Sequence, residues 1–191
     1  MGDLPPAGAI PAETTDYAVF EGMFRRTLHV EPSSPLADAL REVGFDLRAP
    51  KGRYPSEVWD SALKVAARHQ YPDRTEAEGL LELGRRFTAG FFETIVGKVI
   101  ASIIPFLGME RMMVRVPKFA AMTTSGMNLD VQREGDGRWR LRYRSRTLSP
   151  EFLAGAVEGG LARTRMPVSV QIENRTAEGF DLVVTEAGKG T

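Results

Sequence analysis

The chain has 191 residues, of which 42% are hydrophobic and 26% are charged, as in an ordinary folded domain with its own core. Lys and Arg together number 25, as do Asp and Glu, so no overall basic charge attracts nucleic acid. The chain has no cysteine, which excludes disulfides and thiolate metal sites and favours a cytoplasmic protein. The longest apolar run, Val99 to Met109, is too short to span a bilayer.

The first residues are rich in Pro, Ala and Thr, and we expect 1–16 to be a disordered leader. Residues 17–187 should form a single domain, because no linker-like stretch or internal repeat divides them. Within this domain, 17–120 should be helical and 126–187 should form a sheet.

Helix signals follow one another through the first half of the chain. The apolar and basic segment 17–30 and the segment 35–43 predict two helices, and Tyr54-Pro55-Ser56 begins a third that reaches about His69. The pair Thr75 and Glu78 predicts a capping box. We expect it to begin one long helix that ends at Pro105 and is bent, broken or closely approached at Gly84, Gly90 and Gly97, followed by a short helix over 109–116. The long helix repeats an apolar residue every fourth position: Leu83, Phe87, Phe91, Ile95, Val99 and Ile103.

Two hairpins are predicted in the second half. Residues 128–134 and 138–144 alternate in polarity around Gly135-Asp136-Gly137, and folding about this turn places Asp130 opposite Arg142. Ser149 and Pro150 begin a helix, and 168–184 alternates as a second hairpin. The sequence therefore predicts an α+β fold, in which a helical N-terminal half packs on a C-terminal antiparallel sheet of two hairpins with an inserted helix.

A row of arginines on the first hairpin is the clearest charged feature. It could bind phosphate, but acidic residues on the facing strand favour a solvated surface with cross-strand ion pairs. In the predicted register Arg144 and Arg146 have no acidic partner, so they are the better candidates for binding an anion. The row consists of Arg138, Arg140, Arg142, Arg144 and Arg146.

No motif indicates catalysis or a metal. The two histidines, His29 and His69, are far apart and form no metal-ligand spacing. Gly97-Lys98 resembles the end of a phosphate-binding loop, but Phe92 and Val99 stand where Gly and Ser or Thr are required. We therefore expect a protein that is not an enzyme, with no metal site.

The C-terminal half resembles the heme-nitric oxide/oxygen-binding (H-NOX) domain, chiefly over 139–186. The likeness rests on the strand Trp139 to Arg146, on Leu148 and on the helix Phe152 to Gly159. It extends upstream to about residue 54 through Tyr54 to Trp59, Leu83 to Phe87 and Val116-Pro117-Lys118-Phe119. The chain resembles even more a family of small myxobacterial paralogs, over nearly its whole ordered part. This likeness rests partly on the same residues: Tyr54-Pro55, Val58-Trp59, Tyr71-Pro72, Leu83 to Phe87 and Gly90-Phe91.

The departures from H-NOX proteins concern the heme. The family clamps heme propionates with Tyr-x-Ser-x-Arg, and here Tyr143 and Ser145 match while Thr147 replaces the Arg. The family's iron ligand is a His on the helix before the Pro-Phe element, and this chain has no His after His69. Met109, Met112 or Met113 would be weak substitutes. The resemblance therefore implies an H-NOX-like module without a cofactor.

These observations predict a sensor or regulatory module in bacterial signalling that binds an apolar small molecule or a protein partner. Alternatives are an interaction scaffold with no cavity and a residual heme-based gas sensor. We expect the acidic group of a ligand at a mouth formed by Arg144, Ser145 and Arg146. We expect the apolar part of the ligand to bind in a cleft between the helical half and the sheet. If this cleft is closed, the residues predicted to line it are part of the core instead. The predicted pocket residues are Phe87, Phe91, Ile95, Val99, Met112, Met113, Phe119 and Tyr143.

Overall fold

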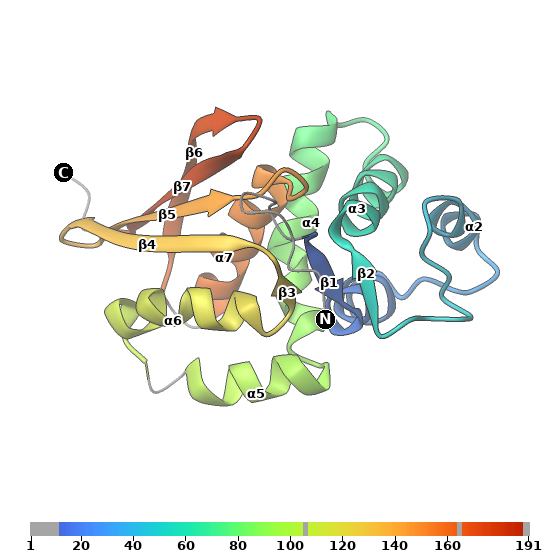
Figure 1. Ribbon diagram of the computed structural model, residues 1–191, viewed down its shortest axis with the longest axis horizontal. Helices are drawn as coiled ribbons and strands as arrows, with labels where there is room; N and C mark the ends of the chain where they lie inside the picture. The colour runs from blue at the N-terminus through green and yellow to red at the C-terminus, as the bar shows by residue number, and fades with distance from the viewer. Residues whose placement is uncertain (1–11, 105–106, 164–165, 189–191) are drawn as a thin grey trace, which may run out of the picture.

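The computed structural model describes residues 12–104, 107–163 and 166–188. The first half is helical, and the second combines strands with helices (Figure 1). The helices are α1 (Tyr17–Phe20), the π-helical segment η1 (Glu21–Thr27), α2 (Pro35–Glu42), α3 (Ser56–Gln70), α4 (Glu76–Phe91), α5 (Ile95–Ile103), α6 (Met109–Ala121) and α7 (Pro150–Arg163). The strands are β1 (Thr14–Asp16), β2 (Arg53–Pro55), β3 (Thr124–Ser125), β4 (Asn128–Gly135), β5 (Arg138–Arg144), β6 (Val168–Thr176) and β7 (Gly179–Glu186).

The C-terminal sheet has four antiparallel strands in the order β4-β5-β7-β6. Its apolar face packs against α6 and α7, around a cluster that contains Met113, Leu141 and Leu182. Asp130 lies opposite Arg142, as the alternation predicted, although a bulge between Arg133 and Gly135 shifts the register near the turn. The predicted α+β class and the two hairpins with an inserted helix are confirmed.

A small second sheet of three strands, in the order β2-β1-β3, connects the two halves. Its central strand corrects the expected boundary of the leader, because Thr14–Asp16 pairs with β2 on one side and with β3 on the other. Residues 1–11 of the expected leader lie outside the described residues. A strand from the beginning of the chain therefore ties the helical half, through β2, to the start of the sheet half, through β3.

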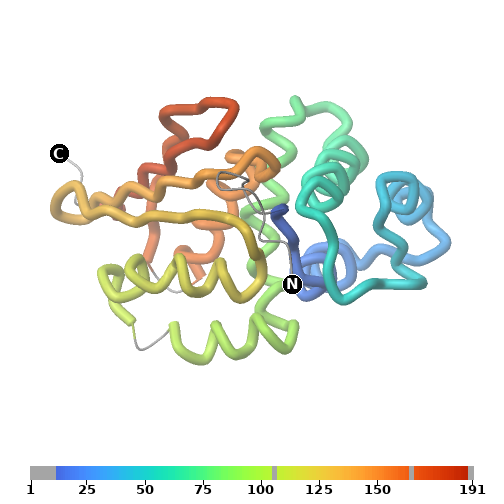
Figure 2. The backbone as a smooth tube through the Cα atoms, viewed as in Figure 1, coloured from blue at the N-terminus to red at the C-terminus, as the bar shows by residue number. Residues whose placement is uncertain are grey.

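The helix α4 runs between the helical half and the sheet half (Figure 2). It crosses α7 so closely that a Cβ on Gly84 would collide with the carbonyl oxygen of Phe152, and one on Gly155 with that of Leu81. Only glycine permits backbones to approach in this way. The sequence had left open whether glycines bend or break the predicted long helix or admit another backbone, and Gly84 does the last of these.

The core of the helical half is filled by aromatic side chains. The ring centroid of Phe20 lies 4.7 Å from that of Phe45, 4.6 Å from that of Tyr54 and 5.0 Å from that of Trp59. The cluster continues through Trp59 to Phe87 and Phe152. Such contacts bind α1 and η1 to α3, α4 and α7 by burial of large apolar surfaces.

The predicted long helix is two helices. α4 ends at Phe91, and Thr94 caps α5 by accepting a hydrogen bond from the N–H of Gly97 at 3.0 Å. The apolar residues at every fourth position therefore have different surroundings on the two sides of this break. Phe87 and Phe91 are buried, whereas Ile95 is 84% exposed and Val99 is 50% exposed. α6, by contrast, is longer than expected, because Pro117 lies inside it. Among the described residues, no helix is long and apolar enough to cross a membrane.

Candidate functional site

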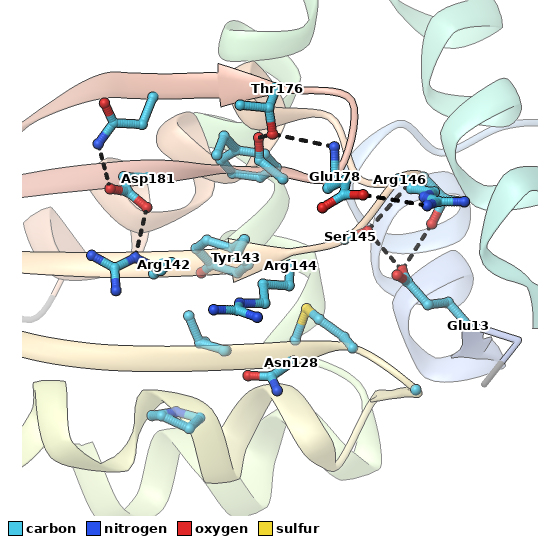
Figure 3. Close-up of a pocket in the computed structure, with 18 of the residues that line it drawn as sticks. Glu13, Asn128, Arg142, Tyr143, Arg144, Ser145, Arg146, Thr176, Glu178 and Asp181 are labelled. Carbon is cyan, nitrogen blue, oxygen red and sulfur yellow. Dashed lines mark hydrogen bonds and ion pairs between the residues drawn. The ribbon is translucent and has the colours of Figure 1, made fainter. Parts of the chain in front are cut away.

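A cavity of about 1150 Å³ lies at the junction between the small sheet and the four-stranded sheet (Figure 3). One wall comes from the ends of β4, β5 and β7 and from the β6–β7 turn, and another from the residues before β1 and the C-terminal end of α6. Its lining includes Glu13, Glu57, Pro117, Ala121, Met127, Asn128, Leu129, Arg142, Tyr143, Arg144, Ser145, Arg146, Thr147, Asn174, Thr176, Glu178, Phe180 and Asp181.

The predicted mouth and the predicted apolar pocket have different outcomes. Arg144, Ser145 and Arg146 all line the cavity, but Tyr143 is the only one of the predicted pocket residues that does. Two of the others are exposed on α5, and the rest pack into or against the cores on either side of the helix–sheet boundary. The exposed residues are Ile95 and Val99, and the packed ones are Phe87, Phe91, Met112, Met113 and Phe119.

The carboxylate of Glu13 accepts hydrogen bonds from two hydroxyl groups that follow the end of β5. Ser145 Oγ donates to Glu13 Oε2 at 2.7 Å, and Thr147 Oγ1 donates to the same oxygen at 2.9 Å. Ser145 Oγ also accepts the N–H groups of Thr147 and Leu148, both at 3.2 Å. Glu13 is only 7% exposed, and its carbonyl accepts the N–H of Ser56 at 2.9 Å. These bonds join the start of the chain to the end of β5 and to the start of α3.

Sequence analysis missed Glu13, because it lies in the segment expected to be disordered. Its hydrogen-bond partners follow it by more than a hundred residues, so no local pattern signals the contact. The replacement of an Arg by Thr147, which sequence comparison treats as a loss, supplies the second of these hydroxyls.

The arginine row forms ion pairs on the outer face of the sheet, but not all with the predicted partners: Arg138 pairs with Glu134 as predicted, whereas Arg142 pairs with Asp181 rather than with Asp130. Arg140 pairs with Glu134, with Glu173 at 2.9 Å and with Asp181 at 3.0 Å. Burial opposes ionisation of Asp181, but hydrogen bonds from Asn174 and Arg140 keep the pKa of its carboxyl below the usual value. The guanidinium groups over most of this row are therefore already neutralised by protein carboxylates.

Arg144 differs from the rest of the row. Arg142 lies 3.5 Å from Asp181, and Arg146 lies 3.8 Å from Glu178, which sequence analysis had not found as its partner. Within the described part of the chain, Arg144 is the cavity-lining cation without an ion pair. It is exposed and lies opposite Asn128 in the sheet register.

Apolar side chains line another part of the cavity. The rings of Tyr143 and Phe180 stack with their centroids 5.1 Å apart, and both residues are buried. Burial raises the pKa of the Tyr143 phenol. Met127 and Leu129 are half-buried beside this stack, in the cluster under the sheet. The cavity thus combines an apolar patch, a free guanidinium and several carboxylates.

Among the described residues, no group of three or more His, Cys, Asp and Glu side chains is placed to hold a metal ion. His29 lies beside a smaller depression near Leu47, and His69 lies in the last turn of α3. Neither histidine lines the large cavity.

A family model covers residues 14–185, which is most of the chain. The chain belongs to the DUF2378 family, described as a protein of unknown function. No curated protein matches it. The family model begins at the first residue of β1, which agrees with the ordered strand found there.

Solved structures that match this DUF2378 protein include H-NOX domains. An oxygen-binding H-NOX domain related to soluble guanylate cyclases is 10% identical, with a TM-score of 0.61 over 91% of this chain and 95% of that one. An H-NOX mutant from K. algicida is 10% identical, with a TM-score of 0.59 over 91% and 97%. A structure from a study of heme redox potential and porphyrin distortion is 11% identical, with a TM-score of 0.66 over 89% and 99%. The fold is therefore H-NOX-like.

The residues of this chain do not fit a heme. In the resemblance to H-NOX domains, the end of β5 would hold a propionate, but Ser145 and Thr147 are hydrogen-bonded to Glu13. The helix that would carry the iron ligand contains no His. Of its methionines, Met113 is fully buried against the sheet. The lack of a His on this helix and the hydrogen bonds of Ser145 and Thr147 to Glu13 both argue against a bound heme.

Proposed function

We propose that this protein is a heme-free, non-enzymatic regulatory module that binds a small molecule in the cavity beside β5. The ligand would have an apolar body and one acid group. The observation that carries this proposal is Arg144, a cation without an ion pair in the described chain, which lines the same cavity as the Tyr143–Phe180 stack from the opposite face of the sheet. A guanidinium binds a carboxylate or phosphate well, and the stacked rings suit an apolar body.

The number of acid groups follows from the carboxylates around Arg144. Glu178 and Asp181 line the cavity but are paired with Arg146 and Arg142, whereas Glu13 and Glu57 line it without an ion pair among the described residues. A ligand with several negative charges would be repelled by them, because like charges at short range disfavour binding. This favours a monocarboxylic acid over a nucleotide, and it refines the earlier expectation of an apolar ligand with an acidic group at the mouth.

The hydrogen bonds of Ser145 support a regulatory rather than a catalytic site. Its hydroxyl donates to Glu13 and accepts two backbone N–H groups. An oxygen whose lone pairs are used in this way is a poor nucleophile, and no His lines the cavity to act as a base. A cytoplasmic place in bacterial signalling, and a myxobacterial origin, belong to this proposal.

The proposal is tested by calorimetric titration with sodium octanoate and, for comparison, with octanol. Wild-type protein should bind octanoate more tightly than octanol. Arg144→Gln should weaken octanoate binding by about fivefold, the scale of one exposed charge-assisted contact, and leave octanol unchanged. The matched control is Arg68→Gln, which removes an exposed cation far from the cavity, on α3. Equal affinity for the two ligands, or equal loss in both variants, would refute the proposal.

The heme-free part has its own readout. Protein purified from a heme-supplied host should show no Soret band, and hemin should give only weak, unsaturable binding. A saturable, stoichiometric hemin titration would overturn this part while leaving the octanoate result to stand or fall independently.

A further inference from the structure

The exposed large hydrophobic side chains of the described chain are confined to one region. On α5 they recur every fourth residue and form a stripe along one side of the helix. The others lie on α6 and directly after it. They are Ile95, Val99, Ile103, Val114 and Met122. Soluble domains rarely expose a group of apolar residues together, and such a patch usually marks a surface that contacts something.

The same two helices carry four exposed cations without an ion pair among the residues described. They are Lys98 on α5 and Arg111, Arg115 and Lys118 on α6. Glu110 is the only acidic residue on α5 or α6, and it pairs with Arg133 on β4 at 3.4 Å. The chain as a whole is neutral, so this is a local excess of positive charge.

The spacing on α6 makes that excess unfavourable within the protein. Arg111, Arg115 and Lys118 are at positions i, i+4 and i+7, which are neighbours on a helix surface. Like charges at this spacing destabilise a helix. On the four-stranded sheet, by contrast, most cations are paired, as in Arg140 with Glu134 and Glu173. A negatively charged surface outside the protein would relieve the repulsion on α6.

Figure 1 shows α5 and α6 running in opposite directions along the lower edge of the molecule. Ile100 and Ile104 face inward and belong to the core of the helical half, and Met113 belongs to the core under the sheet. The aliphatic and cationic residues are on the remaining, exposed sides of the two helices. We name these residues the α5–α6 face.

We propose that the α5–α6 face is a peripheral membrane-binding surface for anionic phospholipids. Aliphatic side chains beside Lys and Arg are what an interfacial helix needs, because the apolar groups enter the acyl boundary while the cations contact headgroup phosphates. Neither helix crosses the bilayer; both would lie in its surface. This function is independent of the cavity and of its ligand.

Two other occupants fit the face less well. A second copy of this chain would bring the same cations together, and like charges across an interface disfavour association. A protein partner would usually be anchored by aromatic residues in pockets. None of the exposed large hydrophobic side chains in the described chain is aromatic. The large cavity shares only Pro117 and Ala121 with α6.

The test is co-sedimentation of the whole chain with sucrose-loaded vesicles, either pure phosphatidylcholine or containing about 30% phosphatidylglycerol. The protein should pellet with the anionic vesicles only, and raising the salt to about 0.5 M should release it. Replacing Arg111, Arg115 and Lys118 together by Ser should weaken binding roughly a hundredfold, at about fivefold per cation. Ile95→Ser with Val99→Ser should weaken it about tenfold.

The matched control replaces Lys51, Arg68 and Arg163 by Ser, which removes three exposed cations outside the α5–α6 face. It should bind anionic vesicles within about twofold of wild type, and circular dichroism should show that every variant is folded. Equal binding to both vesicle types, binding to neither, or equal loss in the control would overturn the proposal. So would a dimer in sedimentation equilibrium that the Val99→Ser variant dissociates, because the face would then join two copies.

Discussion

The aromatic core of the helical half and the cavity at the end of the sheet differ in packing and in polarity. In the core, Phe20, Phe24 and Phe45 are completely buried and their rings contact one another. At the cavity, buried polar groups, Glu13 and Ser145, lie beside open space. A filled core stabilises and leaves no room for a ligand. The ligand site that we propose therefore lies at the junction of the halves rather than between the helices.

The largest expected effect is in the aromatic core. Phe20→Ala should lower the free energy of unfolding by about 4 kcal/mol, because it leaves a void among the rings of Phe45, Tyr54 and Trp59. Urea denaturation measures the loss. Arg144→Gln, at the cavity, should change stability by less than about 0.5 kcal/mol. A Phe20→Ala variant of normal stability but altered octanoate affinity would mean that the core, and not the cavity, is the ligand site.

The parts of the fold that sequence analysis predicted correctly are those with local signals. Alternation on both sides of Gly135-Asp136-Gly137 defined the first hairpin and placed Asp130 opposite Arg142. Thr75 and Glu78 form the expected capping box. In each case the residues that decide the structure lie within a few positions of one another, so single-sequence patterns are sufficient.

The elements that were not predicted correctly are those whose structure depends on contacts between residues far apart in the sequence. The repeat from Leu83 to Ile103 suggested one helix that its glycines could bend or break, but nothing local identifies Thr94 as the cap of a second helix. β1 has only three residues, and its pairing with β2 and β3 is non-local. The choice between pocket and core for the apolar stripe stayed open in the sequence for the same reason, because such a stripe shows that a face is buried or binds something, but not which.

An intermediate effect is expected at the junction. Ser145→Ala removes one hydroxyl from the Glu13 carboxylate and leaves the N–H groups of Thr147 and Leu148 without this acceptor. Unfolding free energy should fall by about 2 kcal/mol. Thr147→Val removes only one hydrogen bond to Glu13 and should cost about 1 kcal/mol.

A double-mutant cycle isolates the contact between the first residues of the chain and β5. Ser145→Ala and Glu13→Ala should couple by about 1 kcal/mol or more, as contacting residues do. The pair Glu13→Ala and Arg68→Ala, which are not in contact, should be additive in the same denaturation measurement. Additivity in both pairs would show that the Glu13–Ser145 hydrogen bond does not form in solution.

The smallest effect at neutral pH, and one that grows with pH, is expected at Tyr143. Burial raises the pKa of its phenol, whereas the unfolded chain releases that proton near pH 10. Above that pH the unfolded state binds fewer protons than the native state, so stability falls by up to about 1.4 kcal/mol per pH unit. The Tyr143→Phe variant has no phenol to ionise at this position, so its stability relative to wild type should rise by up to about 1.4 kcal/mol per pH unit above pH 10.

Tyr17 in the helical half provides the comparison, because partial burial raises its pKa against the opposing charge of Arg25. Tyr17→Phe should therefore give a weaker rise in urea denaturation at the same pH values, and an equal rise would place the two phenols in equivalent surroundings.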